Sequence, residues 1–204
     1  NTLTEIGTDF SDVVPTKGIT NQLSSGRCWL FTGLNVLRSK AIMRWNLPSL
    51  ELSQNYLFFY DPLEKANLYL QGVIDTRKQS FDERMVDWLF QNPLSDGGTF
   101  CGVADLVAKY GVMPKEAFPE TFQSNNTGGF TSVMKQLLRQ QGLELRAMGE
   151  SKKVTDKQLQ DKKVEMLGEI YRMLTLAYGV PPTEFTWSQR DAKGKVVSTD
   201  TYTP

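Results

Sequence analysis

Cys28 has the sequence surroundings that a nucleophilic thiol needs. It follows Gly26 and opens the apolar run 28–31, which predicts the first turn of a helix. The unpaired N–H groups and the dipole of such an end stabilise a thiolate, the form of cysteine that attacks a carbonyl carbon. Gln22 precedes the turn-forming segment 24–26, so its amide is placed to stabilise an oxyanion together with the Cys28 backbone N–H. On this pattern alone, a buried packing thiol is an equally good interpretation.

The composition restricts the chemistry that can accompany this thiol. The 204 residues include no histidine, and the two cysteines, Cys28 and Cys101, do not form a Cys-x-x-Cys pair. An imidazole base and the common structural zinc sites therefore cannot be completed by these residues alone, and we expect neither a metal nor a cofactor. Two cysteines are too few for a disulfide framework, which favours a reducing compartment. For Cys101, packing is favoured over a place in the wall of a cleft.

The charge balance argues against a nucleic-acid binder. The chain has 23 basic and 23 acidic side chains and a formal net charge of zero, whereas nucleic-acid binders usually show a basic excess. The lysine-rich stretch 152–163 is interleaved with acidic residues and is interpreted as a solvated helix face, with nucleic-acid contact as the alternative. No apolar run approaches the roughly 18 residues of a membrane span, so no membrane partner is expected.

The elements around Cys28 are expected to be mostly helical. A helix from Cys28 to near Pro48 is apolar on most faces, which predicts a central and buried position. The segment 92–98 is a loop, because proline, aspartate and two glycines follow one another there. Further helices are predicted from residue 52, with a kink or restart at Pro62, and over 82–91. Two more are predicted over 103–110, with Gly111 as C-cap, and over 130–141, closed by Gly142. A long helix is predicted from the charged stretch 151–163 to about Gly179, and a hairpin over 185–197.

The cysteine lies in the segment Gln22-Leu23-Ser24-Ser25-Gly26-Arg27-Cys28-Trp29-Leu30-Phe31. This segment resembles the nucleophile segment of papain-like cysteine peptidases, and within them the bleomycin hydrolase and aminopeptidase C branch. Further blocks that resemble this branch are 51–57, 92–98, 107–119 and 181–187. The resemblance therefore covers nearly the whole chain.

The resemblance implies a role for each matching residue. Cys28 is the expected nucleophile, which is acylated by the substrate, and Gln22 with the Cys28 backbone N–H is the expected oxyanion hole. Gly97 and Gly98 are expected to line the cleft, where an extended peptide hydrogen-bonds to the backbone of Gly98. Secreted members commonly join two positions by a disulfide where this chain has Ser25 and Ser95, and the absence of both cysteines suits a cytosolic enzyme.

The resemblance also implies an α+β papain-like fold of which this chain is mainly the helical lobe. The β-barrel-like lobe, which in this family supplies the catalytic His and Asn, is expected to be largely missing. Residues 1–204 are then the N-terminal portion of a longer enzyme, inactive by themselves, and 130–180 are a helical insertion of the larger branch.

The implied activity is that of a cytosolic thiol aminopeptidase, which releases N-terminal residues from short peptides and assembles as a homohexamer. Two alternatives stay open. One is a papain-like endopeptidase, which would lack the C-terminal segment that in this branch restricts cleavage to the N-terminus of a peptide. The other is a peptide-binding or assembly module that kept the Cys28 loop without catalysis.

Overall fold

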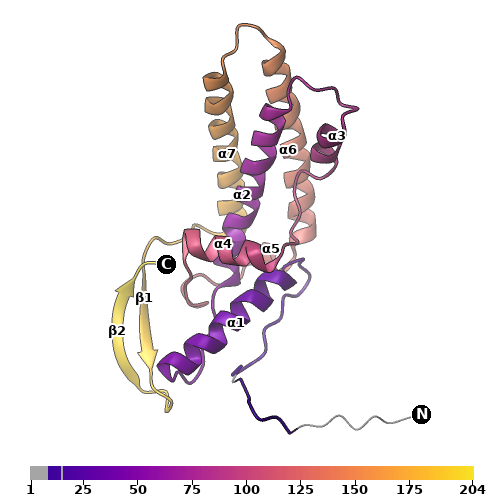
Figure 1. The fold of residues 1–204 in the computed structure, drawn as a ribbon. Coiled ribbons are helices and arrows are strands. Elements are labelled where there is room, and N and C mark those ends of the chain that lie inside the picture. Colours follow the sequence, from indigo (N-terminus) through magenta and orange to yellow (C-terminus); the bar gives the residue numbers. More distant parts are fainter. Residues whose placement is uncertain (1–8, 15) are drawn as a thin grey trace, which may run out of the picture.

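The computed structural model describes residues 9–14 and 16–204, which form a mainly helical chain with one small sheet (Figure 1). In these residues the elements are α1 (Cys28–Trp45), α2 (Gln54–Asp75), α3 (Arg84–Gln91), α4 (Phe100–Tyr110), α5 (Phe122–Asn125), α6 (Thr127–Glu150), α7 (Asp156–Tyr178), β1 (Phe185–Arg190) and β2 (Val196–Tyr202). The prediction of a mainly helical chain that ends in a hairpin is confirmed.

Helices α2, α6 and α7 stand side by side as the upright layer of Figure 1 and enclose much of the core. Leu70, Leu138 and Leu174, one from each helix, are fully buried there. The neighbouring aromatic residues Phe58 and Phe59 are also buried. In the described part of the chain, no helix combines the length and the apolar character that crossing a membrane requires.

Pro62 lies inside α2, which runs through it as one helix instead of restarting. A proline in a helix removes one backbone hydrogen bond and usually costs about 3 kcal/mol. The turns on both sides bury Phe59 and Ala66 completely, and this burial holds the helix together across the missing bond.

The prediction that Gly142 closes a helix is wrong, because α6 continues through it to Glu150. The reason is packing: a Cβ atom at this position would lie 2.4 Å from the hydroxyl oxygen of Tyr69 and 3.2 Å from the ring of Phe90. Glycine here permits a close approach between α6 and its neighbours. Gly111, in contrast, has a φ of 73° and ends α4 as predicted.

Helix α1 lies across the lower part of Figure 1 and packs against α2 and α4. The prediction that α1 is buried on most faces is only partly correct. Leu30 and Leu34 are buried, but Val36, Met43 and Trp45 are 46%, 52% and 53% exposed. Val36 and Met43, seven positions apart, lie on one exposed side of α1, and Trp45 is exposed on the other side at the last residue of the helix.

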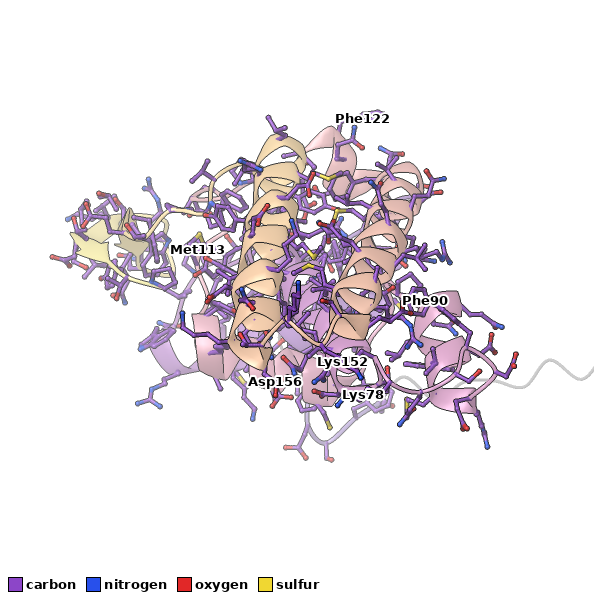
Figure 2. The ribbon with its side chains drawn as sticks, turned by 90° about the horizontal axis from the view of Figure 1, so that it is seen from above. Lys78, Phe90, Met113, Phe122, Lys152 and Asp156 are labelled. Atoms are coloured by element: carbon purple, nitrogen blue, oxygen red, sulfur yellow. The ribbon has the colours of Figure 1, made fainter. Side chains whose placement is uncertain are left out.

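The charged stretch 152–163 is largely solvated as predicted, but it is helical only from Asp156, and residues 152–155 belong to the turn before α7. Helix α7 begins at Asp156, and Thr155 and Gln158 form a reciprocal capping box at its start. Figure 2 shows Lys78, Lys152 and Asp156 at the same end of the bundle, where the residues after α2 meet the α6–α7 turn. Lys157 and Lys162 each pair with nearby acidic side chains, so part of the positive charge is already compensated.

Strands β1 and β2 pair antiparallel and stand at one side of the helices in Figure 2. Phe185 faces Tyr202 in the register, and a bulge interrupts the pairing after Gln189. Gly194, with a φ of 82°, and Asp191 close the turn, as the sequence predicted.

Candidate active site

Cys28 is the first residue of α1, and its thiol is exposed. The backbone N–H groups of Leu30 and Phe31 donate to the Arg27 carbonyl, each at 3.0 Å, so the helix begins directly at the cysteine. The first turn carries no acidic side chain that would compensate the positive end of the helix dipole. The interpretation of Cys28 as a buried packing thiol is therefore wrong, and the exposed thiol lies where a thiolate is favoured.

Arg27, the residue before α1, is fully buried and holds the start of this helix in place. Its Nη1 atom lies 2.8 Å from Glu120 Oε2, its Nε donates to Ser25 Oγ at 2.9 Å, and its guanidinium lies over the rings of Phe31 and Phe58 at 5.1 and 5.2 Å. Removing one charge from such a buried pair typically costs about 3–5 kcal/mol. The orientation of Cys28 therefore depends on residues far away in the sequence.

Gln22 lies on the turn that leads into α1. Its Nε2 donates to the Ser25 carbonyl at 2.5 Å, and the Ser25 hydroxyl donates back to the Gln22 carbonyl at 2.6 Å. Ser24 pairs with the α5–α6 junction, because its N–H donates to Asn125 O at 3.1 Å and its carbonyl accepts from Thr127 N at 3.2 Å. One amide hydrogen of Gln22 is used in this turn, and the amide carries a second one.

Asp96 connects the turn before Cys28 to the loop 92–98. Its Oδ2 accepts from the Gly26 N–H at 2.8 Å and from the Thr127 hydroxyl at 2.6 Å, and its carbonyl accepts from Trp29 Nε1 at 2.9 Å. Burial opposes ionisation, but these hydrogen bonds outweigh it and hold the pKa of Asp96 below its ordinary value. A Cβ at Gly26 would lie 2.3 Å from Asp96 Oδ1, so glycine is needed for this contact.

Gly97 and Gly98 follow directly and are exposed. Within the residues that the structure describes, neither the N–H nor the carbonyl of Gly98 has a hydrogen-bond partner. A Cβ at Gly98 would lie 2.6 Å from the indole ring of Trp29, the residue that follows Cys28. The structure thus brings the backbone of Gly98, which has no hydrogen-bond partner among the described residues, against the neighbour of Cys28.

The serines at the two positions of the implied disulfide form local contacts instead. Ser25 closes the Gln22 turn, and the Ser95 hydroxyl accepts from the Gly97 N–H at 3.1 Å. Asp96 makes the connection between the two loops. Sequence reasoning missed Asp96 because a single aspartate in a loop gives no signal of its distant partners.

The packing interpretation of Cys101 is wrong, because its thiol is exposed. Helix α4 buries Val103 and Leu106, which lie on one face, and Cys101 in the first turn is on the solvent side of that face. Arg27 and Glu120, by contrast, are site residues that sequence reasoning passed over, since their pairing joins positions 93 apart.

Asp61 of α2 pairs with Lys65 at 2.6 Å near the loop 92–98, and burial raises the pKa of Asp61 to about 6 although Lys65 opposes this. Because this value exceeds the ordinary 3.8, the folded state binds the proton more tightly than the unfolded state. Asp61 therefore lowers the free energy of unfolding as pH rises from 3.8 to about 6, in total by about 3 kcal/mol. Asp61→Asn is expected to remove this dependence, measured by urea unfolding of the intact protein at several pH values.

The matched control is Glu64→Gln, because Glu64 lies on the same helix and has the opposite shift. Burial disfavours its charged form, but hydrogen bonds from Lys109 and Tyr110 outweigh this and lower the pKa of Glu64. Its stabilising contribution is present above the ordinary pKa and is lost as pH falls, so the two variants should differ from wild type with opposite slopes. Equal slopes would contradict the assignment of Asp61.

Comparisons with known proteins agree with this geometry. The model of the peptidase C1-like family matches residues 1–204. Aminopeptidase C of Lactobacillus delbrueckii subsp. lactis is 39% identical over 185 residues, which are 91% of this chain and 41% of that protein. Bleomycin hydrolase of Homo sapiens is 38% identical over 186 residues, which are 89% of this chain and 41% of that protein.

A solved structure agrees as well. The crystal structure of PepW from Lactobacillus rhamnosis HN001 has a TM-score of 0.89 and 35% identity, and the match covers 95% of this chain and 43% of that one. The chain thus spans about two fifths of the length of these three relatives. With an exposed cysteine at a helix start and a family model that matches from end to end, this chain belongs to the peptidase C1-like family of papain-like cysteine peptidases.

Proposed function

We propose that the intact protein is a thiol aminopeptidase and that Cys28 is its nucleophile. The observation that carries this proposal is the exposed Cys28 thiol at the start of α1, with the unpartnered backbone of Gly98 beside Trp29. Relatives named aminopeptidase C and bleomycin hydrolase support the reaction class.

In the proposed reaction, the Cys28 thiolate adds to the carbonyl carbon of the first peptide bond. The carbonyl oxygen becomes an oxyanion, which the Cys28 N–H and the second amide hydrogen of Gln22 stabilise. The C–N bond then breaks, the amine leaves with a proton, and an acyl-thioester remains on Cys28. Water hydrolyses the thioester, which returns the thiol and releases the N-terminal residue as an acid. The backbone of Gly97 and Gly98 holds the substrate in an extended conformation.

The proton transfers in this reaction need a base that these residues do not contain. The chain has no histidine, so we propose that the imidazole comes from another part of the intact enzyme and that residues 1–204 alone are inactive. The assignment of 130–180 as a helical insertion, which α6 and α7 largely occupy, belongs to the same proposal.

The site of action is proposed to be the cytoplasm. Both cysteines are free and exposed, a state that a reducing compartment maintains. The partners are proposed to be short peptides, with assembly into a homohexamer and without nucleic acid, in line with the zero formal charge.

Two fluorogenic amides test the proposal against its alternatives in the intact protein. Alanine methylcoumarin amide with a free α-amine is expected to be hydrolysed at least about 100-fold faster than its N-acetyl form, because an aminopeptidase recognises the charged amine. Similar rates for both amides would instead show an endopeptidase. Hydrolysis of neither amide, with peptide binding retained, would show the non-catalytic module.

A further inference from the structure

Lys65 of α2 reaches across to the loop that carries the two cleft glycines. Its Nζ donates to Asp61 Oδ2 at 2.6 Å, to the Ser95 carbonyl at 2.8 Å and to the Gly97 carbonyl at 2.7 Å. An ammonium group has three hydrogens, and here each has an acceptor. The side chain is only 27% exposed, so this lysine is held in place on the loop and does not extend freely into solvent.

The contacts of Lys65 continue those of Trp29. Lys65 holds the carbonyls of Ser95 and Gly97, while Trp29 Nε1 holds the carbonyl between them, that of Asp96. The Lys65 ammonium also lies 5.4 Å from the centre of the Trp29 ring, within the range of a cation–π contact. Three successive peptide carbonyls are thereby fixed, while the backbone groups of the next residue, Gly98, have no partner among residues 9–14 and 16–204.

This arrangement differs from an ordinary surface ion pair, which contributes little to stability. Two of the three acceptors are backbone atoms, so the contacts define where the loop runs regardless of the loop side chains. Asp61, on the preceding turn of the same helix, is buried and directs the ammonium toward the loop. The effect is therefore expected in substrate binding and not mainly in folding.

We propose that Lys65 is a positioning residue that sets the Gly97–Gly98 backbone for the peptide substrate. It does not touch the reacting atoms; it acts through the loop that binds the substrate backbone. A displacement of this loop by about 1 Å would misplace the bound substrate backbone, and with it the scissile bond relative to Cys28, and cost up to about 100-fold in kcat/KM. This inference rests on the proposed aminopeptidase function.

The test compares Lys65→Met, which keeps the length of the stem but loses the charge, with Lys65→Arg in the intact protein. Lys65→Met is expected to lower kcat/KM for the free-amine substrate at least 10-fold, mainly through a higher KM, and Lys65→Arg to recover part of this loss. Alkylation of Cys28 by iodoacetamide, which does not need the Gly98 backbone, is expected to stay within 2-fold of wild type. The matched control is Lys109→Met, which removes another lysine that pairs with a carboxylate of α2 but does not reach the loop.

The outcomes separate positioning from a general loss of structure. A kcat/KM for Lys65→Met within 2-fold of that for Lys109→Met overturns the proposal. A parallel fall in the hydrolysis rate, the alkylation rate and the melting temperature of Lys65→Met overturns it as well. If the wild-type protein releases no N-terminal residue, the proposed function fails. Amide hydrogen exchange then tests separately whether Lys65 positions the Gly97–Gly98 backbone. Exchange at the Gly97 N–H, which donates to the Ser95 hydroxyl, must then rise at least 10-fold in Lys65→Met and not in Lys109→Met, and an unchanged rate would refute the role of Lys65.

Discussion

Replacing Cys28 with alanine is expected to reduce amide hydrolysis by the intact protein at least about 10³-fold, the scale on which peptidases lose activity without their nucleophile. The reason is the absence of the sulfur that forms the acyl-thioester, with no other nucleophile at the start of α1 to replace it. The measurement is kcat/KM for the free-amine substrate, and an unchanged melting temperature shows that the fold persists.

Cys101 provides the matched control for this variant. It is also a free, exposed cysteine in the first turn of a helix, so it shares the local setting of Cys28 without the Gln22 turn. Cys101→Ala is expected to keep wild-type activity. If Cys28→Ala hydrolyses the substrate as fast as Cys101→Ala does, the assignment of Cys28 is wrong.

Gly98→Ala is expected to lower kcat/KM about 100-fold. The added Cβ would meet Trp29 Cδ2 at 2.6 Å, a separation that Cβ atoms essentially never show, so the loop or the ring must move. Either movement displaces the substrate backbone relative to the neighbouring Cys28. Steady-state kinetics with the free-amine substrate, together with the alkylation rate of Cys28, measures the effect.

Gly102→Ala is the control for this steric argument. Gly102 faces the same Trp29 ring, but its Cβ would lie 3.6 Å away, an ordinary van der Waals contact. It also lies inside α4, where alanine is a better helix former than glycine. We expect wild-type kinetics for this variant, and equal losses in both variants would refute the specific role of Gly98.

The parts of the fold with local signals were predictable from the sequence. The start of α1 at Cys28 and the hairpin turn each depend on residues within a few positions of one another. Gly111 likewise ends α4 because a single residue there adopts a positive φ. The exposed thiol and the free glycine backbone follow from these local features together with the family resemblance.

The parts that depend on distant partners could not be predicted. Nothing near Arg27 indicates that it is buried against Glu120, and nothing near Lys65 indicates that it holds two carbonyls of another segment. Gly142 shows the same limit, because glycine that ends a helix and glycine that admits a neighbouring ring are identical in sequence. The supports of the site are tertiary, and only the structure shows them.

The distance along the chain between the nucleophile turn and its supports has a consequence for biosynthesis. Asp96 lies 70 positions after Gly26, and Glu120 lies 93 positions after Arg27. At about 5–20 residues per second, roughly 5 to 20 s pass between the synthesis of Arg27 and that of Glu120. Throughout that interval the nascent chain carries its cysteine without the ion pair that fixes α1. The peptidase geometry is thus gained late, after the segment around α5 has left the ribosome.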